Sequence, residues 1–452
     1  MNALRWAAVA LVILAPLPLG SNHPETWSLL SLLIGILLLT GCGLIWRDAD
    51  ALSIQHRLII PLAIFTAIVC FIILQTVDVG PRLGNPIWQE INAVTGRPVA
   101  NTISVNPGDT MTALMRLLAY AGVFWLAFSM AHDGTRAWQH IRYFAYASLA
   151  FAVYGVIVYF AGNETILWFE KWAYFGDLTS TFVNRNSYAT FAGMGFLAAA
   201  ACVLRELSHL KITRVKDLTE TPPRRLKRFY VLSLTLLITA TALFLTHSRG
   251  GFLATLAGSV LFIVGAVALQ RGQKLMAIAA ALLFLGIVAF TLTISGDLTM
   301  ERLFATRLDS STRDDVYLLV LEGINASPMI GWGYGTFEEA FRPFYSYRIG
   351  FANWSMAHNT YLETAFELGW PTAILFFSIF LVFAVTLISG IYKRRRQRLL
   401  PMLGLSLLLL SGLHAIVDFS HQIPAVAVSF AWLIGTCIAQ SYSSANAGSR
   451  AH

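Results

Sequence analysis

Hydrophobic residues run in long blocks along this chain, and short polar stretches separate the blocks. A window of about nineteen residues finds the blocks that can cross a bilayer, because about 20 apolar residues span its hydrocarbon core as a helix. The predicted fold class is therefore all-α, a polytopic membrane helix bundle of about twelve transmembrane helices. The predicted crossings are 4–20, 27–46, 57–77, 111–131, 141–161, 187–205, 230–246, 252–270, 275–294, 369–391, 399–417 and 424–441.

The pattern divides the chain into three parts. Residues 1–294 hold the first nine predicted crossings with short loops, 295–368 form one long loop, and 369–452 hold the last three crossings and the C-terminus. The long loop is rich in aromatic residues, which prefer a membrane interface or a packed lid. We expect it to contain short helices, one beginning at 310–315 behind a hydroxyl N-cap, and a tight glycine turn at 331–335.

Composition and charge agree with a membrane protein. Hydrophobic residues make up 56% of the chain and charged residues 12%. Basic residues cluster in 205–228 and 393–398, and the positive-inside rule makes both stretches cytoplasmic, together with both termini. The net charge of +8 then mostly reflects topology, so no nucleic-acid partner is expected. The loops 78–110, 162–186 and 295–368 are left on the far side, where extracytoplasmic chemistry would take place.

Several kinds of chemistry have no signature in this sequence. Walker loops, dinucleotide fingerprints, nucleophile elbows and zinc-protease helices do not occur, so a nucleotide is not expected to take part. The cysteines show neither close pairing nor metal-ligand spacing, and we interpret them as small core residues. They are Cys42, Cys70, Cys202 and Cys437.

Two arginines stand where far-side loops meet predicted crossings. Arg185 lies just before one crossing, and Arg249 lies in a connection so short that it must be close to the hydrocarbon boundary. Arginines at this depth usually face the bundle interior and bind a carboxylate, a carbonyl or a phosphate. The planar guanidinium suits phosphate, so both are candidate phosphate ligands. The alternative is snorkelling or a structural salt bridge.

His358 is the far-side histidine between the long aromatic loop and the start of a predicted helix. Its ordinary pKa of about 6.5 allows an imidazole to accept a proton near neutral pH, so it could activate an acceptor hydroxyl. The alternative is that it only caps the helix or binds a loop carbonyl. Asn359 is the candidate N-cap of that helix, with Glu363 reaching back to the first turn.

Two further polar features lie on predicted crossings. Arg116 lies inside the fourth crossing and is a secondary candidate for anion contact. His414 and Asp418 are four residues apart near the end of the eleventh crossing, so they would share a helix face, with His421 nearby. A metal site or a proton relay is conceivable there, but a pair that orients the bundle is the favoured interpretation, and no metal is expected.

Four motifs, taken together, give the sequence a family resemblance. In chain order they are Phe182-Val183-Asn184-Arg185-Asn186, His247-Ser248-Arg249-Gly250-Gly251, Gly331-Trp332-Gly333-Tyr334-Gly335 and His358-Asn359-Thr360-Tyr361-Leu362-Glu363. In order and spacing, this set resembles the O-antigen ligase and O-antigen polymerase superfamily over nearly the whole chain.

The resemblance implies a bacterial inner-membrane glycosyltransferase whose active site faces the periplasm. Such enzymes move a glycan from an undecaprenyl pyrophosphate carrier to an acceptor sugar hydroxyl, with inversion and without a metal or other cofactor. By motif, Arg185 and Arg249 would bind the pyrophosphate, and His358 would deprotonate or orient the acceptor hydroxyl. The motif neighbours expected to support them are Asn186, His247, Asn359 and Tyr361.

The acceptor stays open at the level of sequence. A ligase joins the finished glycan to lipid A core, whereas an O-antigen or exopolysaccharide polymerase joins it to another carrier-linked repeat. Both need the same pyrophosphate ligands and base, and we favour the ligase slightly. A lipid-linked sugar transporter or flippase is less favoured, because the polar residues gather at one face rather than at the bilayer midplane.

Overall fold

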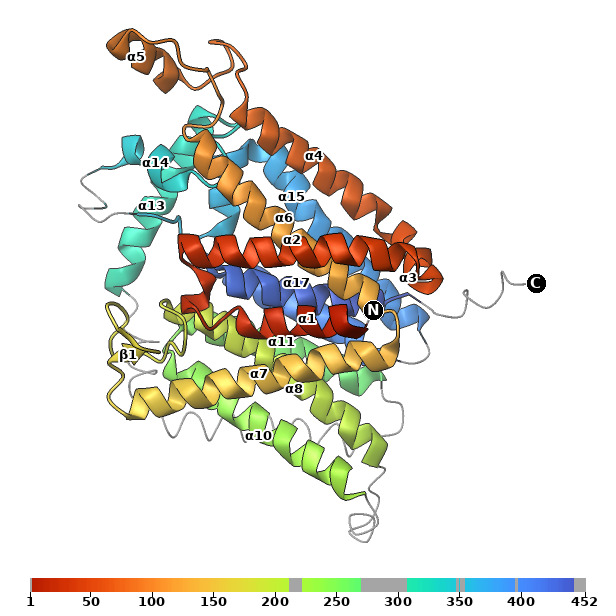
Figure 1. Ribbon diagram of the computed structural model, residues 1–452. Coiled ribbons are helices and arrows are strands. Elements are labelled where there is room, and N and C mark those ends of the chain that lie inside the picture. The colour runs from red at the N-terminus through yellow and green to blue at the C-terminus, as the bar shows by residue number, and fades with distance from the viewer. Residues whose placement is uncertain are drawn as a thin grey trace.

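Apolar helices make up most of the computed structural model, which describes residues 2–210, 222–269, 307–346, 349, 354–394 and 397–442 (Figure 1). Within these residues, eight helices are long and apolar enough to cross a membrane, and three apolar helices are shorter. The long ones are α2 (Pro24–Trp46), α4 (Ile59–Thr76), α6 (Pro107–Met130), α7 (Gly134–Phe160), α8 (Arg185–Leu210), α10 (Pro223–Leu245), α11 (Arg249–Leu269) and α15 (Thr360–Lys393). The shorter ones are α1 (Asn2–Leu14), α16 (Leu399–His414) and α17 (Pro424–Ala439).

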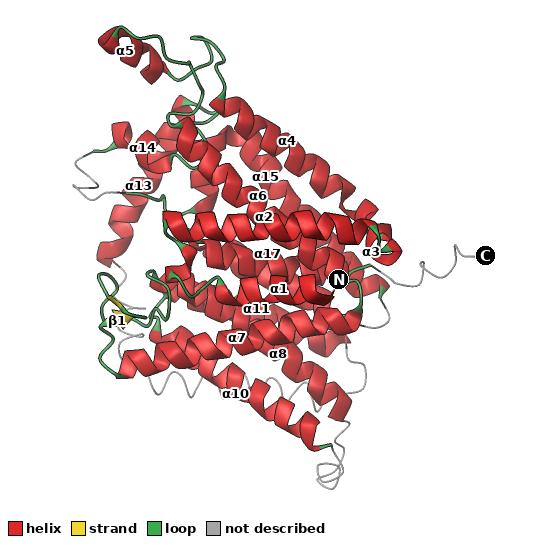
Figure 2. Ribbon diagram, in the orientation of Figure 1, coloured by secondary structure: helices red, strands yellow, loops and turns green. Residues whose placement is uncertain are grey.

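These helices confirm the predicted all-α membrane fold. The eight long and three shorter helices coincide with eleven of the twelve predicted crossings, while the crossing predicted at 275–294 lies outside the described residues. The count of twelve therefore stays a prediction. In the described part of the chain, the strands are β1 (Thr165–Ile166) and β2 (Phe169–Glu170), which form a small hairpin at one end of the bundle (Figure 2).

The two ends of the bundle differ. Both ends of the described chain lie at one of them, where Leu4 packs with Met130 and Gln440 donates a 2.6 Å hydrogen bond to the Ala131 carbonyl (Figure 1). The opposite end, here called the loop-rich end, carries the hairpin and three helices outside the apolar bundle. These are α5 (Pro86–Thr95), α13 (Arg307–Ala326) and α14 (Phe337–Phe341).

Helix α8 forms the centre of the bundle. It packs against α7, α10, α11 and α16 and is almost entirely buried. Glycine and alanine fill much of its length, and small side chains let membrane helices approach closely. Because α8 begins at Arg185, its first residues lie in the middle of the loop-rich end rather than at the lipid-facing rim.

The described residues of the long aromatic loop, 307–346, 349 and 354–359, pack against α15 and are here called the lid, which has its own apolar core. Val316 and Val320 of α13 pack with Phe337 of α14 and Phe366 of α15. Helix α13 begins at Arg307, slightly ahead of the predicted start at 310–315.

The predicted glycine turn at 331–335 is present in the lid. Gly331, Gly333 and Gly335 all have positive φ, and a Cβ at Gly331 would lie 2.3 Å from the Glu367 carbonyl oxygen. The turn is therefore pressed directly against α15, where a larger residue would not fit.

Helix α15 starts earlier than the predicted crossing at 369–391. It begins at Thr360, and Gly369 (φ 71°, ψ 162°) interrupts it before Pro371. The hydropathy window missed the first part because that part carries Glu363 and Glu367. Both carboxylates are buried beneath the lid rather than exposed to lipid.

Candidate active site at the loop-rich end

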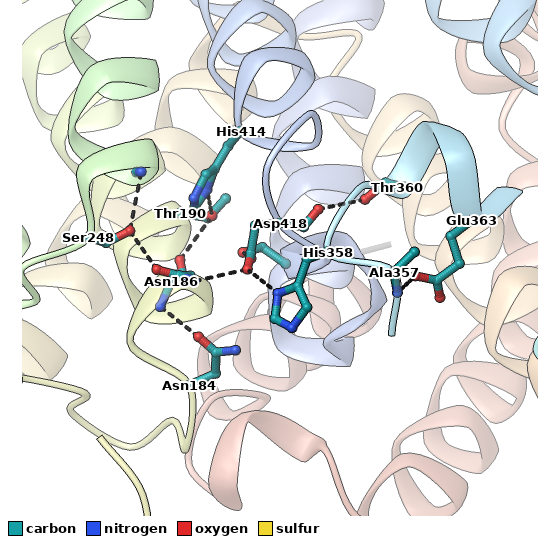
Figure 3. Close-up of polar contacts among 12 residues, drawn as sticks. Asn184, Asn186, Thr190, Ser248, Ala357, His358, Thr360, Glu363, His414 and Asp418 are labelled. Atoms are coloured by element: carbon teal, nitrogen blue, oxygen red, sulfur yellow. Dashed lines mark hydrogen bonds and ion pairs between the residues drawn. The ribbon is translucent and has the colours of Figure 1, made fainter. Parts of the chain in front are cut away.

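Side chains from three separate motifs meet at the loop-rich end (Figure 3). The Ser248 hydroxyl donates to Asn186 Oδ1 at 2.8 Å, and Asn186 Nδ2 donates to Asp418 Oδ1 at 3.0 Å. The same Asp418 oxygen lies 4.0 Å from Nδ1 of His358. We call Ser248, Asn186, Asp418 and His358 the site network. It joins the starts of α8, α11 and α15 to the connection between α16 and α17.

His358 lies in a mostly enclosed position at the start of α15. Its φ is 53°, and its carbonyl accepts a 3.0 Å hydrogen bond from the Tyr317 hydroxyl. Burial lowers the pKa of His358, while the Asp418 carboxylate opposes this shift and Arg313 adds to it. Because burial is the largest effect, the imidazole is neutral near pH 7 and can accept a proton. Nδ1 is buried and has no hydrogen-bond partner among the described residues.

Asn359 is the N-cap of α15, as predicted. Its side-chain oxygen accepts from the backbone amides of Tyr361 and Leu362 at 3.0 and 3.1 Å. Tyr361 in turn donates to the Gly412 carbonyl at 2.9 Å, and Thr360 Oγ1 donates to the Asp418 carbonyl at 2.9 Å. The beginning of α15 is therefore fixed to the end of α16, which holds His358 next to Asp418.

Arg185 forms a structural salt bridge, which was the alternative to phosphate binding expected for it. Its Nη1 lies 2.6 Å from Asp177 Oδ2, and His247 Nδ1 lies 2.8 Å from the other oxygen of that carboxylate. Lys171 holds the same loop by donating to the Asp177 carbonyl at 2.6 Å. Arg185 Nε is buried without a partner within the described ranges, and the side chain keeps 25% of its surface exposed. The guanidinium thus has donors left for an anion.

Arg249 is the first residue of α11, directly after the helix cap. Ser248 Oγ accepts from the Gly251 amide at 3.2 Å, so the residue in the site network also caps this helix. The Arg249 side chain is half-buried and makes no ion pair or hydrogen bond within the described part of the chain. Helix N-termini attract anions through their free amides and dipole, which adds to the arginine charge.

Two groups of candidate residues are arranged differently from the prediction. Arg116 lies over the Trp27 ring, 4.6 Å from its centroid, on α6 rather than on a helix that carries the site network. The expectation that His414 and Asp418 share a helix face is wrong, because α16 ends at His414. His414 Nδ1 lies 2.6 Å from Thr190 Oγ1 and ties α16 to α8, whereas Asp418 turns to His358.

Two residues at this site had not been assigned to it from the sequence. Asp418 was expected to pair with His414, but it faces His358. Arg313 was considered only as part of a helix start. Burial lowers the pKa of His358 and raises the pKa of Tyr174, and the positive charge of Arg313 acts on both groups. Helix α13 therefore brings a third arginine to the site.

The arrangement can bind an anion and accept a proton at neighbouring points. Arg185 and Arg249 begin α8 and α11, whose first turns carry Asn186 and the amide bound by Ser248 of the site network. Arg313 of α13 acts electrostatically on the neutral imidazole of His358, which Asp418 faces. Within the described ranges, no three His, Cys, Asp or Glu side chains come together as metal ligands.

Comparison with known proteins identifies the central region of the chain. Residues 234–377 match the family model described as O-antigen ligase. The matched stretch runs from α10 into α15 and contains Arg249, Arg313, the glycine turn and His358, whereas Arg185 and Asp418 lie outside it. No curated protein matches the chain. The match confirms the resemblance drawn from the motifs: residues 234–377 of this multi-pass membrane protein are similar to the O-antigen ligase family.

Proposed function

We propose that this protein is a glycosyltransferase that moves a glycan from an undecaprenyl pyrophosphate carrier to an acceptor sugar hydroxyl, acting as a ligase on lipid A core. One observation carries the proposal: Asn186 joins Ser248, the neighbour of Arg249, to the Asp418 carboxylate that faces His358. Anion-binding and proton-accepting groups thereby share one end of the bundle. The O-antigen ligase match supports lipid-linked glycans and membrane lipids as partners in general.

The reaction needs one bond made and one bond broken. The acceptor hydroxyl oxygen attacks the anomeric carbon, and the bond between that carbon and the pyrophosphate oxygen breaks. The electron pair leaves with the lipid pyrophosphate, and the hydroxyl proton passes to the imidazole of His358. Attack opposite the leaving group inverts the anomeric centre. No nucleotide is consumed, because the carrier already holds an activated sugar.

His358 suits the proton-accepting role in this scheme. The burial that lowers its pKa keeps it unprotonated before the reaction. Once it becomes positively charged, the Asp418 carboxylate stabilises it from the Nδ1 side. The 4.0 Å separation is longer than a hydrogen bond, and such contacts often tighten when substrate binds.

The arginines would stabilise the leaving pyrophosphate. Arg249 is the strongest candidate, because its guanidinium is unpaired within the described ranges and lies at a helix N-terminus. Arg185 would share its charge between Asp177 and the ligand. Fixed cations lower the barrier by neutralising charge that grows on the leaving oxygen, the role a metal ion plays in other enzymes.

The orientation in the membrane follows from charge. The basic residues that begin α10 and end α15 lie away from the loop-rich end, at the side of the described termini (Figure 1). Since positively charged loops stay in the cytoplasm, the loop-rich end would face the periplasm and both termini the cytoplasm of a bacterial inner-membrane protein.

Reconstitution tests the proposed function and separates it from its alternatives. Purified protein in liposomes is incubated with a carrier-linked repeat, with and without lipid A core, and the products are measured by mass spectrometry. Glycan on lipid A core supports the ligase. A longer carrier-linked chain without lipid A core would show a polymerase, and transport across the bilayer without a new glycosidic bond would show a transporter.

A further inference from the structure

A buried carboxylate binds the backbone of the residue that precedes His358. Glu363, one turn into α15, is 2% exposed. Its Oε2 accepts a hydrogen bond from the backbone amide of Ala357 at 2.7 Å (Figure 3). Its Oε1 accepts a hydrogen bond from Gln422 Nε2 at 2.6 Å. One carboxylate therefore binds the residue that precedes His358 and also the short turn that follows Asp418.

The backbone at His358 needs such support. A φ of 53° is unfavourable for a residue with a side chain and persists only where neighbouring contacts hold it. The Asn359 cap fixes the chain after His358, and the Glu363 carboxylate fixes it before. Without the bond to Ala357, this segment could relax toward an ordinary backbone conformation and turn the imidazole away.

The other oxygen of Glu363 binds the turn that follows Asp418, the partner of His358. The backbone amide of Gln422 donates a 2.8 Å hydrogen bond to the Phe419 carbonyl and closes a turn. The Phe419 ring packs edge-on against the His358 ring, with the ring centroids 4.9 Å apart. Asp418 immediately precedes Phe419. Glu363 is thus a direct link between the segment that carries the imidazole and the segment that carries the carboxylate.

We infer that Glu363 is a positioning residue that sets the separation of His358 Nδ1 from Asp418 Oδ1. The inference rests on the proposed function, in which His358 accepts the acceptor's proton. The two atoms are 4.0 Å apart, just beyond hydrogen-bond distance. A shift of about half an ångström therefore decides whether a hydrogen bond forms between them. Glu363 itself touches neither reacting group.

The first test compares three substitutions in the reconstituted transfer assay. Glu363→Ala should lower kcat about 10- to 100-fold while the KM for the lipid-linked donor stays near wild type, because the arginines are untouched. Glu363→Gln should restore most of kcat. Its amide oxygen can still accept from Ala357, and Gln422 can rotate its own amide to present oxygen. Gln422→Ala, which removes one of the two bonds, should give an intermediate loss.

The second test is a double-mutant cycle with a matched control. Glu367 lies one turn further along α15 and is 5% exposed, but its Oε1 accepts from the Phe337 amide of the lid at 3.3 Å. Glu363→Ala combined with Asp418→Ala should cost less than the product of the single effects, because both changes remove the same contact. Glu367→Ala combined with Asp418→Ala should be multiplicative. Thermal unfolding of each variant separates loss of fold from loss of kcat.

The possible results are distinct. A Glu363→Ala protein with wild-type kcat, a Glu363→Gln protein as impaired as the alanine variant, or a multiplicative effect with Asp418→Ala would each overturn the positioning role. If Glu363→Ala does not fold, full kcat in Gln422→Ala overturns it instead. Full activity of His358→Ala would overturn the proposed function itself, whatever the Glu363 variants do.

Discussion

Replacing Asp418 by Asn removes the negative charge that faces His358 and changes little else. Asn186 donates to Asp418 Oδ1 at 3.0 Å and the Ser420 hydroxyl donates to the other oxygen. An asparagine oxygen can keep the bond to Asn186, and the serine hydroxyl can reverse its direction. Asp418 is 1% exposed at its side chain, so the loss of charge is not masked by water.

The size of the effect follows from the distance. Two unit charges about 4 Å apart interact by about 4 kcal/mol at an effective dielectric constant of ~20. Asn186 and Ser420 already offset part of the carboxylate charge, so we expect about 2 to 3 kcal/mol less stabilisation of protonated His358 in the transition state. The corresponding fall in kcat/KM is about 30- to 160-fold.

The assay is the pH dependence of kcat/KM in the reconstituted system. Activity requires the neutral imidazole and therefore falls as pH drops through the pKa of His358. Asp418 raises that pKa against the dominant effect of burial, so Asp418→Asn should move the acid limb to lower pH while lowering the plateau.

The control is Asp314→Asn, which makes the same change of charge at an exposed position on α13 and should leave the profile near wild type. An acid limb that stays in place, or moves to higher pH, would refute the pairing of Asp418 with His358.

Three further predictions concern single positions. Arg249→Lys should lower transfer about 10- to 100-fold because an ammonium cannot replace a bidentate guanidinium, and wild-type activity would count against pyrophosphate binding there. Gly333→Ala should destabilise the protein by about 1 to 3 kcal/mol, seen as a lower midpoint of thermal unfolding, since its φ is 114° and the new Cβ would lie 2.5 Å from Ser104 Oγ. An unchanged midpoint would contradict the close contact. Gln75→Leu should also lower the midpoint, because the buried amide donates to the Glu367 carbonyl at 2.9 Å and two more backbone bonds of the lid turn depend on it. Unfolding at the wild-type temperature would argue against that role.

The sequence by itself determined which segments cross the membrane and where several of them end. Hydrophobic length decides crossing, and this is a local property that a window can read. The Asn359 cap and the glycine turn were likewise predicted, because capping and positive φ are requirements of a few neighbouring residues. The hydropathy window did not join the helix capped by Asn359 to the crossing at 369–391, since the first turns of α15 carry buried carboxylates.

Only the tertiary structure decided how the site is assembled. The sequence singled out Arg185, Arg249 and His358 one at a time, but nothing local relates a residue of α8 to one that follows α16. Packing of α15 against α16 brings Asp418 to His358, and the folding of the loop before α8 brings Asp177 to Arg185. A buried charge takes whichever partner the fold supplies, so its role depends on helix ends and tilts that no short sequence pattern records.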